Sequence, residues 1–118
     1  MTRTDPRTAA TIDPAACLAT AAALLARASD LAWAQARSTP DPRLRFRGLG
    51  LDLAAAQALE LLPADVSLES VEDITGSDPL ALLRAAEKVL RRCPVEDLPA
   101  GGSQLVVEVC DLMSELAS

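Results

Sequence analysis

Residues 13–37, which decide the fold, read DPAACLATAAALLARASDLAWAQAR. An Asp that precedes a Pro is typical of a helix start. The Asp carboxylate accepts hydrogen bonds from free N–H groups of the first turn, and Pro fits the next position, where no N–H is needed. Apolar residues then recur at spacings of four and three, at Cys17, Ala21, Leu24, Ala28 and Leu31. Because this is the period of one helix face, we predict a helix from about Pro14 to Arg37.

Two further Asp-Pro pairs, at residues 41–42 and 78–79, each precede another apolar stretch. We predict that they start helices that end near Leu62 and Cys93. In the first of these, Gly48 and Gly50 each weaken a helix by about 1 kcal/mol, and the preceding residues alternate between charged and apolar. We therefore expect this helix to fray before Leu51.

A fourth helix is predicted after the turn at Gly101 and Gly102, with Ser103 as its N-cap and its end near Ala117. The acidic segment 64–77 predicts a short helical turn, capped by Ser67 and closed by Gly76. The four long helices should share one core, with Leu24, Leu51, Leu83 and Leu112 inside it.

The composition supports a helical fold. Half of the 118 residues are hydrophobic, mainly Ala and Leu, and only 2% are aromatic. Ala and Leu favour helices, whereas the residues that favour strands are scarce. We therefore predict an all-α fold, an antiparallel four-helix bundle with two longer N-terminal and two shorter C-terminal helices. A single bundle domain over residues 13–118 should follow a flexible N-terminal tail over residues 1–12.

The residue types argue against several classes of function. The chain has no His, the commonest general base and metal ligand, and its net charge of -6 disfavours nucleic acid as a partner. It contains no Ser-His-Asp set, no zinc-ligand spacing and no dinucleotide fingerprint. Glu108, Asp111 and Glu115 share the polar side of the fourth helix, where we expect them to face water. We therefore predict no enzymatic activity, no metal and no cofactor.

The chain has three cysteines, and Cys17, Cys93 and Cys110 all fall on apolar sides of predicted helices. An odd number of widely spaced cysteines indicates free thiols in a reducing cytoplasm. The charge-free run over residues 14–26 loosely resembles a signal peptide. However, Asp5 and Asp13 stand where the positive region belongs, and the run is too short to span a bilayer. We therefore predict a cytoplasmic protein with three buried, unreactive thiols.

A basic segment and a second apolar helix side form the candidate binding surface. Residues 37–47 carry a net charge of +3, whereas residues 48–118 carry -9. Arg and aromatic residues anchor protein interfaces, and charge asymmetry often marks an interaction surface. The second predicted helix also has apolar residues on two nearly opposite sides. The predicted partner-binding residues are Trp33, Arg37, Arg43, Arg45, Phe46, Arg47, Leu49 and Leu53.

These observations predict a small helical protein–protein interaction or accessory module, homodimeric and without catalytic activity. Its partners would be a second copy, another protein or both, and neither nucleic acid nor a membrane. One alternative is a helical bundle that binds an apolar small molecule, which requires a cavity of a few hundred Å³. Another is an enzyme that uses carboxylates in place of His, which requires inward carboxylates with raised pKa values. An exposed patch at Phe46 and Leu49 would favour the interaction module.

Overall fold

The computed structural model describes residues 13–64 and 76–117, and these residues form helices and no strand. The long helices are α2 (Pro14–Ser38), α3 (Pro42–Leu61), α4 (Pro79–Arg91) and α5 (Gly102–Ala117), and a short 3-10 helix, η2, covers Val95–Asp97. The all-α prediction is confirmed. The predicted tail over residues 1–12, and nearly all of the short turn predicted over residues 64–77, lie outside the described residues.

The Asp-Pro pairs start three of the helices as predicted. The carboxylates of Asp13, Asp41 and Asp78 accept hydrogen bonds from backbone N–H groups two residues later, at 3.1, 3.0 and 3.2 Å. In each case Pro occupies the start of the helix. The local rule that an Asp carboxylate satisfies the free N–H groups of the first turn therefore holds at all three starts.

Two local predictions are wrong. The helix over 42–61 is continuous from Pro42 and does not fray before Leu51. Its glycines lie at close contacts between helices, because a Cβ at Gly48 would lie 2.9 Å from the Trp33 ring and one at Gly50 would lie 2.7 Å from Leu112. The last helix begins at Gly102, so Ser103 lies inside its first turn and is not its N-cap.

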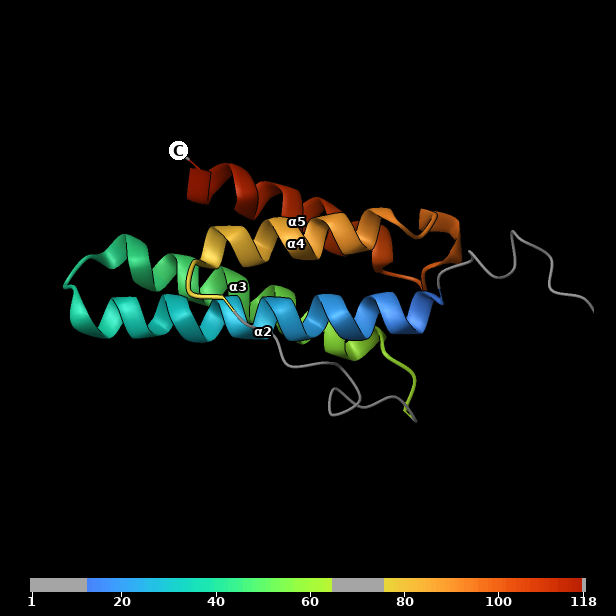
Figure 1. The fold of residues 1–118 in the computed structure, drawn as a ribbon, viewed down its shortest axis with the longest axis horizontal. Coiled ribbons are helices and arrows are strands. Elements are labelled where there is room, and N and C mark those ends of the chain that lie inside the picture. Colours follow the sequence, from blue (N-terminus) through green and yellow to red (C-terminus); the bar gives the residue numbers. More distant parts are fainter. Residues whose placement is uncertain (1–12, 65–75, 118) are drawn as a thin grey trace, which may run out of the picture.

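The four helices surround one apolar core, and Figure 1 shows how they are arranged. α2 lies against α3 and α4, and α5 lies against the same two helices from the other side. Gly101, before α5, lies near the Leu61 side chain at the end of α3, and Gly50 lies near Leu112 towards the end of α5, so these two helices run in opposite directions. Leu24, Leu51, Leu83 and Leu112 all belong to this core, as predicted.

The core depends on small residues in α2. Six of its alanines are buried, so α3 and α4 can approach it closely. α2 is also long and apolar enough to pass a length-and-composition test for membrane spans, a test that buried core helices pass as well. In this structure 56% of its most apolar window is buried against the rest of the protein.

The turn between α2 and α3 projects beyond the start of α4 and the end of α5 (Figure 1). This turn joins Ser38 to Pro42, and the first residues of α3 follow it. The part of α3 nearest the turn is therefore the part least covered by other helices.

Candidate protein-interaction surface on α3

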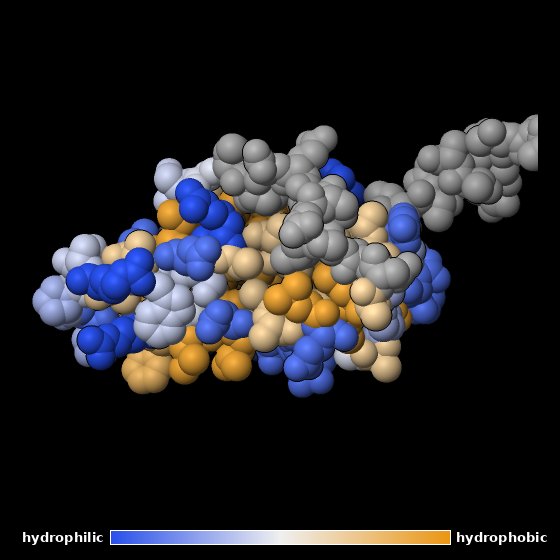
Figure 2. Space-filling model, turned by 90° about the horizontal axis from the view of Figure 1, so that it is seen from below, coloured by the Kyte–Doolittle hydropathy of each residue, from blue (hydrophilic) through white to orange (hydrophobic). Residues whose placement is uncertain are grey.

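α3 carries a row of apolar side chains on the side that faces away from the core. Phe46, Leu49 and Leu53 are 73%, 48% and 61% exposed, and Ala56 continues the row in an exposed position. We call these four residues the outer stripe. Figure 2 shows hydrophobic side chains gathered along this edge of the molecule, next to the strongly hydrophilic end that contains the α2–α3 turn. The spacing of three, four and three residues places all four on one face of the helix.

The opposite side of α3 is occupied by the core. Leu51, Ala54 and Ala58 are fully buried and form part of the apolar cluster with α2. A helix at the edge of a monomeric bundle needs only one such face. The helix therefore carries a second apolar face that nothing in the described part of the chain covers. The sequence prediction that α3 is apolar on two sides matches this arrangement.

The structure places Trp33 away from the outer stripe. Its half-buried ring lies over Gly48, on the side of α3 that contacts α2. Gly48 follows Phe46 by two residues, so the two positions point to nearly opposite sides of the helix. Trp33 therefore holds α2 and α3 together, and the structure does not bring it to the stripe.

The four predicted arginines also separate. Arg37 is exposed in the last turn of α2. Arg43 forms an ion pair with Asp41 at 3.2 Å, and its hydrogen bonds hold the pKa of the Asp41 carboxyl below its ordinary value. Arg45 is exposed on the outer side of α3. Arg47 is half-buried and faces a hollow that residues of α2, α4 and α5 also line. Arg45 lies one helical turn before Leu49 of the outer stripe. Arg43 and Arg47 line an open depression beside Phe46, so they lie near the start of the stripe.

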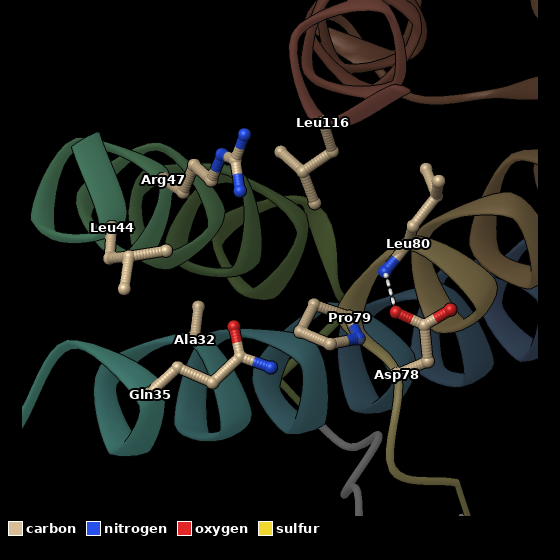
Figure 3. A pocket seen from close by; sticks show the side chains of 8 residues that line it. All are labelled: Ala32, Gln35, Leu44, Arg47, Asp78, Pro79, Leu80 and Leu116. Atoms are coloured by element: carbon tan, nitrogen blue, oxygen red, sulfur yellow. Dashed lines mark hydrogen bonds between the residues drawn. The ribbon is translucent and has the colours of Figure 1, made fainter. Parts of the chain in front are cut away.

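Arg47 lines a small hollow between the helices (Figure 3). Its guanidinium points towards Leu116, and Gln35 and Pro79 lie on the other side of the opening. The hollow has a volume of about 140 Å³. Ligand pockets usually have volumes of roughly 300 Å³ or more, so this hollow is small for the apolar ligand that the alternative function requires. Two wider depressions, over α4 and α5 and beside Phe46, have volumes of about 490 and 410 Å³, but both are more open to solvent than this hollow.

The charges on the exposed part of α3 change sign along its length. Arg43 and Arg45 lie in its first half, and Asp52 and Glu60 lie in its second half. The Asp52 carboxylate accepts a hydrogen bond from the buried Ser29 hydroxyl on α2 at 3.5 Å, a contact that the sequence pattern did not indicate. The basic start and the acidic end are both opposite to the signs that the helix dipole favours.

The three cysteines and the acidic residues of α5 are the remaining candidate groups. Cys17 and Cys93 are buried, and burial raises the pKa of both thiols. Cys110 is only half-buried, which differs from the expectation that all three lie in the core. Asp111 and Glu115 are exposed on α5. Within residues 13–64 and 76–117, no three His, Cys, Asp or Glu side chains are grouped as they would be in a metal site.

Comparison with known proteins supplies no family for this chain. No protein-family model, no curated protein and no solved structure matches it, so the outer stripe of α3 is the basis for a functional proposal.

Proposed function

We propose that this protein is a small cytoplasmic interaction or accessory module, an antiparallel four-helix bundle that binds another protein through the outer stripe of α3 and has no catalytic activity of its own. Its first partner is a second copy of the same chain. The observation that carries the proposal is a line of three large, exposed apolar side chains on a helix whose opposite face already fills the core.

Burial of the outer stripe in a complex would contribute a free energy of the same order as the cost of association. Complete burial of a Leu or Phe side chain contributes about 1.5–3 kcal/mol. Since Phe46, Leu49 and Leu53 are about half to three-quarters exposed, each can still contribute about 1–2 kcal/mol on binding. In a symmetric dimer each contribution occurs twice, for a gross total of about 6–12 kcal/mol. Association itself costs about 4–15 kcal/mol, so the stripe decides whether the complex forms.

A twofold dimer is the simplest arrangement for such a surface. Most soluble oligomers are symmetric dimers in which the same patch serves both copies. The stripe is apolar in its centre and has charged residues beside it, which is the usual arrangement of a protein interface. Binding to a second copy therefore needs no other surface on the chain.

The test is the molar mass of the full chain in solution, measured by light scattering for the wild type and for the double variant Phe46→Asp with Leu49→Lys. We expect a wild-type dimer and a monomeric variant whose helicity by circular dichroism is unchanged, because both side chains are exposed. The matched control is Val107→Asp, which places a charge at another exposed apolar position, on α5, and should remain a dimer. A wild-type monomer, or a double variant that stays dimeric, would contradict the proposal.

A further inference from the structure

The outer stripe has the spacing of a helix–helix seam. Phe46, Leu49, Leu53 and Ala56 alternate steps of three and four residues, the repeat by which two helices pack side chains into one another. The row is large at its first position and small at its last. A partner that packs well against it therefore needs a small side chain opposite Phe46 and a large one opposite Ala56.

The α3 helix of a second copy, running in the opposite direction, offers a small residue opposite Phe46 and a large one opposite Ala56. With the centre of the contact midway between Leu49 and Leu53, each Leu49 faces a Leu53 of the other copy, and each Phe46 faces an Ala56. Four apolar layers then form from one stripe, and no layer places two large aromatic rings together. A parallel pair would instead place Phe46 against Phe46 and leave two small Ala56 residues facing each other.

The charges beside the stripe favour the same direction. In the antiparallel pair Glu60 of one copy lies near the start of the other copy's α3, within about one helical turn of Arg45. Within residues 13–64 and 76–117, neither Arg45 nor Glu60 has an oppositely charged group within 4.0 Å. Each charge also lies at the end of α3 where the helix dipole disfavours it. Antiparallel pairing supplies the missing opposite charge at both ends, whereas parallel pairing would place Arg45 against Arg45 and Glu60 against Glu60.

We infer that the second copy binds with its α3 antiparallel to the first, in a register in which Leu49 faces Leu53 and Arg45 pairs with Glu60. This inference rests on the proposed function, because it specifies the occupant and geometry of the same stripe. The fold supplies the shape and the charges. The twofold axis that relates the two copies lies on the outer side of α3, midway along the stripe between Leu49 and Leu53.

Charge reversal tests the direction of pairing in the full chain. Arg45→Glu alone and Glu60→Arg alone should each raise the dimer dissociation constant by about tenfold, because two symmetry-related pairs become repulsive at once. The double variant Arg45→Glu with Glu60→Arg should return to within about threefold of the wild type. Arg84→Glu reverses an exposed charge on α4 and serves as the matched control, which should change nothing. If the double variant is as weak as the single variants, or if the single variants have no effect, the inference is wrong.

A disulfide test measures the same geometry directly. In a chain with Cys110→Ser, mixing Arg45→Cys protein with Glu60→Cys protein under mild oxidation should give a crosslinked pair, and neither variant should crosslink with itself. Crosslinking of Arg45→Cys with itself would indicate parallel helices and would overturn the inference. The two proposals can fail separately. If Phe46→Asp with Leu49→Lys dissociates the dimer but the charge reversals leave it intact, this geometry is wrong and the proposed function stands. A monomeric wild type would contradict the proposed function itself.

Discussion

Truncation of Leu83 in α4 tests the packing on which the interaction surface depends. Leu83 is fully buried in the core that all four helices share. A Leu→Ala change at such a site removes apolar contacts and leaves a cavity, with a cost of about 2–5 kcal/mol. Since the Leu83 side chain is fully buried, we expect the free energy of unfolding to fall by about 3 kcal/mol, within this range. For a folded domain of this size, that loss should lower the midpoint of thermal unfolding by about 12 °C.

The assay is chemical and thermal unfolding followed by circular dichroism. The matched control is Val107→Ala on α5, at a position that is 58% exposed, where the stability should change by less than about 0.5 kcal/mol. If Leu83→Ala changes the free energy of unfolding by no more than this control does, then Leu83 is not in a packed core. The arrangement of α4 against the other helices would then be wrong.

Four further predictions concern the reactivity and titration of the thiols, a glycine and a helix cap. Cys17 should react with a thiol reagent slowly in the folded protein and rapidly after unfolding, and half-buried Cys110 should react at an intermediate rate. Burial raises the pKa of the Cys17 thiol above its ordinary value of 9.0. The stability that the buried thiol contributes should therefore be complete below pH 9.0 and should decline as the pH rises towards the folded-state pKa. Unfolding curves at several pH values measure this, and a stability that rises over the same range would contradict the burial of the thiol. Gly48→Val should displace the Trp33 ring, shift its fluorescence to longer wavelength and destabilise the protein by about 1–3 kcal/mol, and an unchanged spectrum would contradict the contact. Asp78→Ala removes the N-cap of α4 and should cost about 1 kcal/mol in urea unfolding, and a neutral result would mean that the cap contributes nothing.

The sequence predicts the features that depend on local chemistry. The helix starts follow from Asp-Pro pairs because an N-cap needs only its own first turn, and the core leucines follow from the helical period. The exposed row at Phe46, Leu49 and Leu53 follows from the same period, because a helix with two apolar sides can bury only one of them at the edge of a bundle.

Features that depend on contacts between distant residues are not visible in the sequence. Local preference alone predicts that Gly48 and Gly50 weaken a helix, but in the structure they give space to Trp33 and Leu112. The position of Trp33 away from the stripe also follows from a contact between distant residues, because its ring lies over Gly48 of α3. The hydrogen bond between Ser29 and Asp52 likewise joins two helices, so no spacing within either helix indicates it.

The central claim is that the outer stripe becomes buried when two copies associate. A single-tryptophan reporter tests it most directly, with Trp33→Phe and Phe46→Trp placed together in the full chain. As the protein concentration rises, the account predicts that the emission of the tryptophan at position 46 shifts to shorter wavelength, with the same midpoint as the rise in molar mass from 12.3 kDa to twice that value. An emission that stays at the wavelength of a solvent-exposed indole at every concentration would show that the stripe remains open to water, and would contradict the account.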